Sequence, residues 1–154
     1  MNQLKLLNKK IIISAAAEGI GWSIAQECMQ NGAIVYLTDK NNESLDKISK
    51  HDLYEKQLFL DRVNAHDAQE VEDYFNKIEN KVDSVDALIN NVGIAGPTGK
   101  LEKLNINDWR ETIDININSH FYYTKFSIPL IKNNNGGSII NLSSTAGLFG
   151  FPFR

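Results

Sequence analysis

A glycine-containing turn near the N-terminus has the residue types and spacing to bind a phosphate. The segment 14–21 follows the apolar run 10–13 and precedes an amphipathic pattern that starts at Ile20. Gly19 and Gly21 have no Cβ atom, so we expect a pyrophosphate to approach the backbone closely there. The free N–H groups and the dipole of the helix that follows would attract the anion. The turn therefore predicts a nucleotide-binding fold.

A carboxylate lies where it could bind the sugar next to that phosphate. Asp39 follows Gly21 by eighteen residues and comes directly after a second apolar run, 33–38. In dinucleotide-binding folds, an acidic residue about 20 residues after the glycines accepts hydrogen bonds from the adenosine ribose. The negative charges of Asp39 and Glu18 would repel the 2′-phosphate of NADP, and Lys40 offsets them only in part. We therefore expect NAD rather than NADP as the cofactor.

Strand and helix patterns alternate along the whole chain. Short apolar runs of this kind are typical of strands buried on both faces of a parallel sheet. Strands are predicted at 10–13, 33–38, 57–60, 85–89 and 138–142. Helices are predicted after the turn, with Ile20, Ile24 and Cys28 on one face, at 41–50, after Asp67, and at about 107–132. The alternation indicates one α/β domain over 1–154, a Rossmann-type, doubly wound parallel sheet in three αβα layers, with the first five strands of such a sheet.

Composition and charge exclude several classes of function. The chain has 154 residues, 42% of them hydrophobic, and a formal net charge of −3, so it lacks the basic character of a nucleic-acid-binding protein. The apolar stretch 11–17 is too short for a signal peptide or a membrane span, and we expect a cytoplasmic protein. The single Cys28 cannot form an internal disulfide. The three histidines, His51, His66 and His120, lack metal-ligand spacing, so no metal site is predicted.

Four motifs in succession resemble those of the short-chain dehydrogenase/reductase family, classical type, and they span the whole chain. The glycine turn matches Thr-Gly-x-x-x-Gly-x-Gly, with Ser14 for Thr and Ala15 for the first Gly. An adenine-pocket pair falls at Asn64-Ala65, with Asp61 as the alternative. Asn-Asn-x-Gly occurs at 90–93, and Ile-Asn-x-Ser-Ser at 140–144. The cofactor-binding residues that the turn, Asp39 and the resemblance together imply are Ser14, Ala15, Gly19, Ile20, Gly21, Asp39, Asn64, Ala65, Asn90 and Gly93.

The resemblance also implies catalytic roles. Ser144 matches the serine that hydrogen-bonds the substrate oxygen during hydride transfer, and Asn116 matches a helix asparagine that holds a water in a proton relay. Asn118 is the alternative to Asn116. The family's general acid/base is a tyrosine followed four residues later by a lysine, and the resemblance places this pair after Ser144. No such pair follows Ser144 in the sequence, so we expect the chain to be truncated before it.

Three hypotheses for function follow. The leading one is an NAD-dependent oxidoreductase that moves hydride between nicotinamide and a small-molecule alcohol or carbonyl, similar to the 3-oxoacyl reductases. The second is an inactive, truncated fragment that at most binds nucleotide. The third is a methyltransferase, which also uses a glycine turn and an acidic residue, but the motifs at 90–93 and 140–144 argue against it.

The resemblance implies a homo-oligomer, dimer or tetramer, built partly on the long helix when the protein is full length. We expect no helix to cover the fifth strand, and apolar side chains on the long helix would then be left partly bare. Those named by the pattern are Ile113, Ile117, Phe121 and Ile128. Exposed patches of this kind promote association, so the chain alone is expected to be prone to aggregation.

Overall fold

The computed structural model describes residues 5–153 and contains one parallel sheet of five strands. The strand order is β3-β2-β1-β4-β5, so the chain starts in the middle of the sheet, builds outward to one edge and then to the other. The strands are β1 (Lys10–Ile13), β2 (Ile34–Asp39), β3 (Leu58–Arg62), β4 (Ala87–Asn90) and β5 (Ser138–Asn141). The reversal of direction occurs between β1 and β4, which is where doubly wound sheets bind their ligands.

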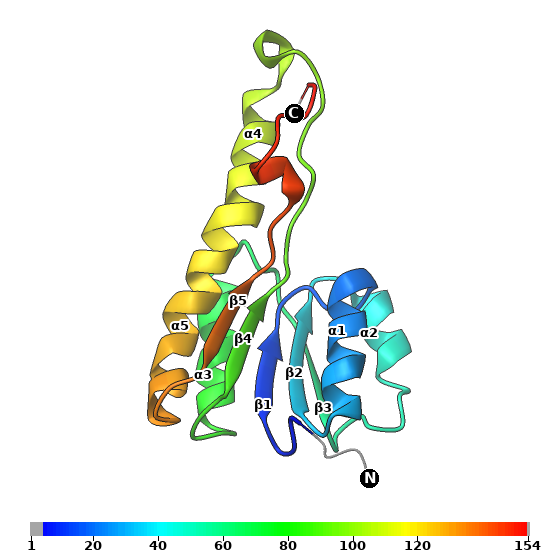
Figure 1. Cartoon of the computed structure of the whole chain (residues 1–154), viewed down its shortest axis with the longest axis vertical. Coiled ribbons are helices and arrows are strands. Elements are labelled where there is room, and N and C mark those ends of the chain that lie inside the picture. The colour runs from blue at the N-terminus through cyan, green and yellow to red at the C-terminus, as the bar shows by residue number, and fades with distance from the viewer. Residues whose placement is uncertain (1–4, 154) are drawn as a thin grey trace.

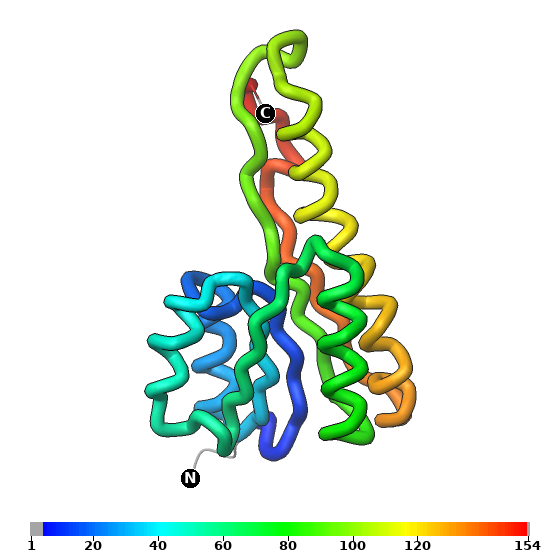
Figure 2. The backbone as a smooth tube through the Cα atoms, turned by 180° about the vertical axis from the view of Figure 1, so that it is seen from behind, coloured from blue at the N-terminus to red at the C-terminus, as the bar shows by residue number. Residues whose placement is uncertain are grey.

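Helices lie on both faces of the sheet, which confirms the three-layer αβα fold (Figure 1). On one face are α1 (Gly19–Gln30) and α2 (Asn42–Ile48). Seen from behind, α3 (Ala68–Glu79) and α5 (Ser119–Asn133) cover the other face (Figure 2). As predicted, side chains cap two of these helices: Asn41 accepts from the N–H of Ser44, and Asp67 accepts from the first turn of α3.

Successive residues of each central strand face opposite layers, so the sheet separates two apolar cores. Ile11 and Ile13 pack with α1 and α2, whereas Ile12 lies with α3 and α5. In the second core the Oγ1 of Thr38 and the phenol of Tyr123 form a hydrogen bond of 2.6 Å, both side chains being fully buried. Burial raises the pKa of Tyr123, so its hydroxyl stays protonated and either group can donate. This bond fixes α5 to the strand that ends in Asp39.

Three features differ from the sequence-based expectation. β3 extends to Arg62 because its pairing with β2 continues to the Asp39–Arg62 pair. The predicted helix 107–132 is not uniform: α4 (Ile106–Ile113) runs through a π-helical turn, η2 (Asp114–Asn118), into α5. Ile20 is 69% exposed, because the first turn of α1 extends beyond the sheet.

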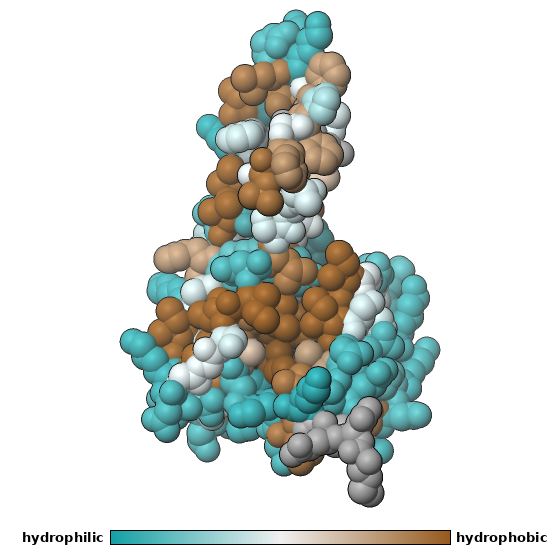
Figure 3. Space-filling model, in the orientation of Figure 1, coloured by the Kyte–Doolittle hydropathy of each residue, from teal (hydrophilic) through white to brown (hydrophobic). Residues whose placement is uncertain are grey.

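An arm extends beyond the carboxyl ends of β4 and β5 (Figures 1 and 2). It consists of the chain from Asn91 through α4, with a 3₁₀ turn, η1 (Leu101–Lys103), and of residues 142–153, with a second, η3 (Thr145–Gly147). β4 and β5 carry no helix on the α1 face, and Figure 3 shows apolar side chains gathered there. Within residues 5–153, no helix has the length and apolarity to cross a membrane.

The expectation of bare apolar side chains on the long helix is confirmed for three of the four residues. Ile117 and Phe121 are about 60% exposed, and Ile128 is also exposed. Ile113 is half-buried. Ile140 of β5, on the uncovered side of the sheet, is 49% exposed. Exposed apolar side chains therefore lie on the outer side of α5 and on the edge of the sheet, and others lie on the arm, among them Leu101, Trp109 and Leu148.

Replacing a buried tyrosine with phenylalanine should affect stability differently at Tyr123 and at Tyr74. Tyr123→Phe leaves the buried Oγ1 of Thr38 without its partner, and we expect the free energy of unfolding to fall by about 1–3 kcal/mol. Tyr74→Phe should leave stability unchanged or raise it, because the Tyr74 hydroxyl is buried without a hydrogen-bond partner. Urea denaturation followed by circular dichroism measures both. Equal losses in the two variants would contradict this account.

Candidate functional site

The turn between β1 and α1 has an unusual backbone. Ala15 has a φ of +50° and Gly19 a φ of +56°, both in the left-handed region that favours glycine. A Cβ added at Gly19 would meet no atom within 4 Å, so the space beside it is open. Glu18, the N-cap of α1, makes no capping hydrogen bond with its side chain. The first N–H groups of α1 are thus free of side-chain caps, which suits the binding of an anion.

Gly21 has a different reason to be glycine from the one that the sequence predicts. It is buried, and an added Cβ would lie 2.6 Å from the Nδ2 of Asn91 and 2.7 Å from the Cα of Ala16. Gly21 therefore faces protein, and its missing side chain allows α1 to pack closely against the turn. The contact of Gly21 with a pyrophosphate stays a prediction, because the packing concerns only the side-chain position and not the backbone N–H. The open position is at Gly19.

Asn91 and Ser14 hold this turn in place. The Nδ2 of Asn91 donates to the carbonyl oxygens of Ala15 at 2.7 Å and Ser14 at 3.2 Å. In return, the buried Oγ of Ser14 accepts from the N–H groups of Asn91 at 3.1 Å and Val92 at 3.4 Å. Ser14 is thus turned toward β4 rather than toward solvent. No role of its own was predicted for Asn91, although it belongs to the Asn-Asn-x-Gly motif.

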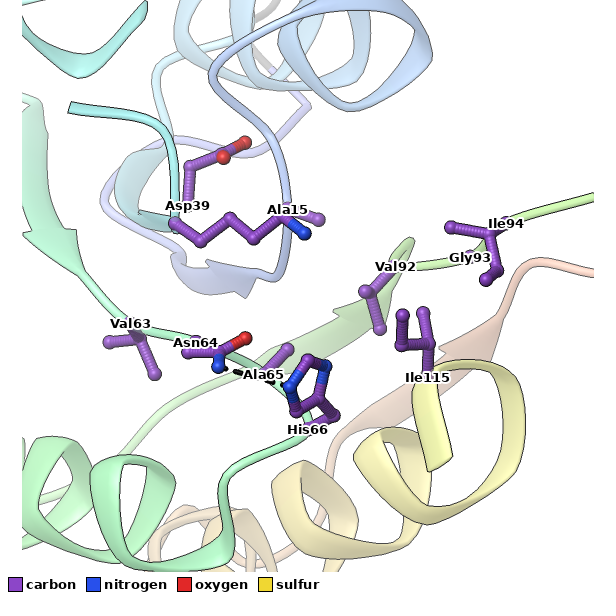
Figure 4. A pocket seen from close by; sticks show the side chains of 11 residues that line it. Ala15, Asp39, Val63, Asn64, Ala65, His66, Val92, Gly93, Ile94 and Ile115 are labelled. Atoms are coloured by element: carbon purple, nitrogen blue, oxygen red, sulfur yellow. Dashed lines mark hydrogen bonds between the residues drawn. The ribbon is translucent and has the colours of Figure 1, made fainter. Parts of the chain in front are cut away.

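Asp39 lies at one end of a small pocket at the carboxyl edge of the sheet (Figure 4). Its carboxylate accepts from the N–H of Ala17 at 3.0 Å and from the N–H of Asn41 at 2.9 Å. The pocket has a volume of about 130 Å³. Its lining residues come from five segments: Ala15, Asp39, Lys40, Val63, Asn64, Ala65, His66, Val92, Gly93, Ile94 and Ile115. These include Ala15, Asp39, Asn64, Ala65 and Gly93 of the predicted cofactor-binding set.

The structure distinguishes Asn64 from its alternative, Asp61. Asn64 lines the pocket, and its neighbour Ala65 is buried beneath it. Asp61 lies within β3, where it forms an ion pair with Lys77 of α3. The carboxylate of Asp61 is therefore already paired outside the pocket. The position of the adenine-pocket pair at Asn64-Ala65 agrees with the geometry.

A second cavity, of about 660 Å³, continues from the first. The two share Val92, Gly93 and Ile94, the segment that leaves β4, so they lie next to each other along the carboxyl edge of the sheet, and together they are called the cleft. Ile20 of α1 lines the second cavity on one side. Asn116, Ser143 and Ser144 line it as well. The cleft therefore brings the two predicted catalytic residues together and places Asp39 at its far end.

Asn116 lies in the π-helical turn and is held by two hydrogen bonds to one residue. Its Oδ1 accepts from the N–H of Ile94 at 2.8 Å, and its Nδ2 donates to the carbonyl of Ile94 at 2.9 Å. Asn118, the alternative, bonds within its own helix to Asp114 and lines neither cavity. The geometry therefore favours Asn116. Its amide, however, is already bonded to the wall of the cleft, which leaves it one hydrogen and one lone pair for a water.

Ser144 and Asn90 differ in how they relate to the cleft. Ser144 is exposed in the second cavity, and its Oγ accepts from the N–H of Ala146, which caps η3. Asn90 is fully buried, and its Nδ2 donates to Thr124 at 3.1 Å and Asn141 at 2.8 Å. Asn90 therefore joins β4 to β5 and α5 and does not line the cleft. Its predicted contact with cofactor is not supported by this position.

Two histidines at the cleft were given no role by the sequence. His120 lines the second cavity, and its Nε2 lies 2.9 Å from the carbonyl oxygen of Val92. His66 lines the first pocket and is bonded to Asn64. The sequence predicts for both histidines only that they do not bind a metal, because their spacing matches no ligand pattern. The fold supplies their hydrogen-bond partners from other segments or from the turn before α3.

Comparisons with known proteins identify relatives over almost the whole chain. The family model described as short chain dehydrogenase matches residues 9–154. Cyclohexanol dehydrogenase of Acinetobacter sp. (strain SE19) is 35% identical over 95% of this chain and 59% of its own length. The 3-oxoacyl-[acyl-carrier-protein] reductase FabG of Thermotoga maritima is 30% identical over 97% of this chain and 61% of its own. The chain thus spans about three-fifths of the length of these curated relatives.

Solved structures agree with this match. The structure of ElxO with NADP bound superposes with a TM-score of 0.87 at 29% identity, and the match covers 96% of this chain and 60% of that chain. The agreement confirms the predicted Rossmann-type α/β fold. That relative was solved with NADP rather than NAD. The comparison therefore does not support the expected preference for NAD over NADP.

The strained alanine in the turn gives a test of this geometry. Ala15→Gly relieves the left-handed conformation, and we expect the free energy of unfolding to rise by up to about 1 kcal/mol, the steric relief exceeding the added chain entropy. Ala16→Gly is the matched control: Ala16 is buried and its φ is not positive, so that change should destabilise the protein. Chemical denaturation measures both variants. A loss of stability in Ala15→Gly would contradict the assigned strain.

Proposed function

The chain belongs to the short chain dehydrogenase family, and we propose that it binds a nicotinamide dinucleotide in the cleft between Asp39 and Ser144 as part of an oxidoreductase. The reaction proposed is hydride transfer between that cofactor and an alcohol or carbonyl compound. The observation that carries the proposal is the pair of adjacent cavities that make up the cleft. Residues suited to a ribose and an adenine line one end, residues suited to a reacting oxygen line the other, and the uncapped turn at Gly19 lies between β1 and α1.

The residues of the turn fit the phosphates of such a cofactor. The space beside Gly19 is open, and α1 presents N–H groups without a side-chain cap. Asp39, held by two backbone N–H groups, would accept the ribose hydroxyls. Asn64 and Ala65 would contact the adenine. When bound, the nicotinamide supplies or accepts the hydride, and it would occupy the cavity lined by Asn116 and Ser144.

The residues at the nicotinamide end would orient the substrate. The Ser144 hydroxyl is exposed there and can donate to an alcohol or carbonyl oxygen, since its present bond with Ala146 uses only a lone pair. Asn116 would fix a water with the hydrogen and lone pair that Ile94 leaves free. Similarity to cyclohexanol dehydrogenase and to the 3-oxoacyl reductase supports a small alcohol or ketone as the substrate class.

A homo-oligomer is part of the proposal. It is supported by the exposed apolar side chains along the outer side of α4 and α5, among them Ile106, Trp109, Ile117 and Phe121. Sedimentation velocity at several concentrations measures this directly.

We propose that NAD is preferred over NADP, because the carboxylate of Asp39 lines the pocket that a 2′-phosphate would enter. Asp39→Asn removes that charge, and we expect the ratio of the NADPH and NADH dissociation constants to fall about fivefold or more, the scale of one charge pair near a protein surface. Lys40→Ala is the matched control, since Lys40 lines the same pocket with the opposite charge. It should raise the ratio. Fluorescence titration with both reduced cofactors measures it.

Tighter binding of NADPH than NADH by the unaltered protein would overturn the preference. Thermal denaturation of each variant shows whether the lost hydrogen bonds of Asp39 have disturbed the turn. If neither cofactor binds at millimolar concentration to folded protein, the proposed function itself is wrong.

A second candidate function is dinucleotide binding without turnover by the 154-residue polypeptide. It is favoured by one observation: among the described residues that line the cavity with Ser144, there is no tyrosine or lysine. General acid/base catalysis by a positioned group contributes typically about 10²–10⁴-fold. We therefore expect this polypeptide to bind NADH and to reduce a panel of ketones no faster than buffer does, as followed by absorbance at the nicotinamide band. Ketone reduction that depends on Ser144 would refute this second candidate.

A further inference from the structure

We propose that His66 sets the direction of the Asn64 carboxamide, and thereby makes the pocket selective for a base that presents an amino group, as adenine does. The inference rests on the proposed function, because it assumes that the small pocket receives the base of a dinucleotide. The proposal adds His66 to that site as a positioning residue. It also gives a physical reason why the pocket would prefer adenine to other bases. The structural basis is the bond between the Nδ2 of Asn64 and the Nε2 of His66, at 3.1 Å.

The backbone of Asn64 is fixed on both sides. Its N–H donates to the Oε2 of Glu70 at 2.8 Å, and its carbonyl accepts from the N–H of Asp67 at 3.0 Å. The same oxygen of Glu70 accepts from the Nη1 of Arg62 at 2.8 Å. These bonds hold the main chain of the turn but leave the side-chain amide free to present either its oxygen or its nitrogen to the pocket.

The side chain of His66 resolves that choice. Among the described residues, the Asn64 carboxamide bonds to the side chain of His66, and both side chains are half-buried in the pocket lining. A neutral imidazole with its proton on Nδ1 offers a lone pair at Nε2, which only the NH₂ end of the amide can satisfy. In the structure the Nδ2 of Asn64, and not its Oδ1, bonds to the Nε2 of His66, which Figure 4 marks with a dashed line, so the Oδ1 is left for a ligand in the pocket.

An acceptor oxygen in this position discriminates between bases. The exocyclic amino group of adenine is its hydrogen-bond donor, whereas its exposed ring nitrogen accepts. Hypoxanthine has the same size but carries a carbonyl oxygen where adenine has the amino group. That oxygen would face the oxygen of Asn64 with neither able to donate. The pocket should therefore favour NAD over nicotinamide hypoxanthine dinucleotide, and the preference should depend on His66.

The proton position on His66 is the first test, and it needs no ligand. In the folded chain at pH 8, long-range ¹H–¹⁵N correlation spectra distinguish a ring proton on Nδ1 from one on Nε2. We expect the proton on Nδ1, with Nε2 as acceptor. A proton on Nε2 would reverse the amide and overturn the proposal.

The second test is a double-mutant cycle read out by calorimetric titration with NAD⁺ and with nicotinamide hypoxanthine dinucleotide. We expect the unaltered protein to prefer NAD⁺ by about 3- to 10-fold, the value of one net hydrogen bond. His66→Phe should reduce the preference to less than about twofold, because the amide can then turn freely. Asn64→Asp should keep the preference, since a carboxylate presents an acceptor in either direction. In the Asn64→Asp background, His66→Phe should have no further effect.

The outcomes separate this proposal from the function on which it rests. If the folded protein binds neither dinucleotide, the proposed function is wrong and the orientation role fails with it. If it binds NAD⁺ but His66→Phe leaves the preference intact, only the role of His66 is overturned. The same holds if His66→Phe acts equally in the Asn64→Asp background, because a merely structural effect would do so.

Discussion

Reciprocal hydrogen bonds between Ser14 and Asn91 join the two halves of the cleft. Asn91 holds the carbonyl groups of the strained turn, and the hydroxyl of Ser14 receives the two N–H groups that follow β4. Because both side chains are buried or half-buried at the switch point between β1 and β4, each turn is positioned by the other. The left-handed Ala15, the close packing at Gly21 and the shared wall Val92–Ile94 all depend on this arrangement.

The sheet could be derived from the sequence because its signals are local. The isoleucines of β1 and the residues of β2 from Val35 to Thr38 are buried on both sides of a parallel sheet, and Thr38 is the one polar residue among them. Helix starts were equally local, since Asn41 and Asp67 bond to N–H groups two or three residues later. The ends of strands were less certain, because β3 continues only as far as its partner β2 offers a register.

The direction in which a side chain points could not be derived in the same way. Asn90 and Asn91 are adjacent in one motif, yet Asn90 turns into the sheet toward Asn141 and Asn91 turns toward the glycine turn. Neighbouring residues of a strand alternate between faces, and which face meets which partner is decided by elements far away in sequence. The close packing at Gly21 could not be foreseen for the same reason, because its neighbour Asn91 is distant along the chain. Likewise, nothing local distinguishes Asn116 from Asn118.

The π-helical turn that contains Asn116 separates the long helix into two parts with different roles. α5 is anchored in the core by Tyr123 and the fully buried Ser127, whereas α4 has no buried residue and carries the exposed Ile106 and Trp109. A π-turn holds an extra residue, and loss of that residue would rotate α4 by about 100° about the axis of α5. The surface that α4 presents can thus change through a one-residue difference in length, while the packing of α5 against the sheet stays as it is.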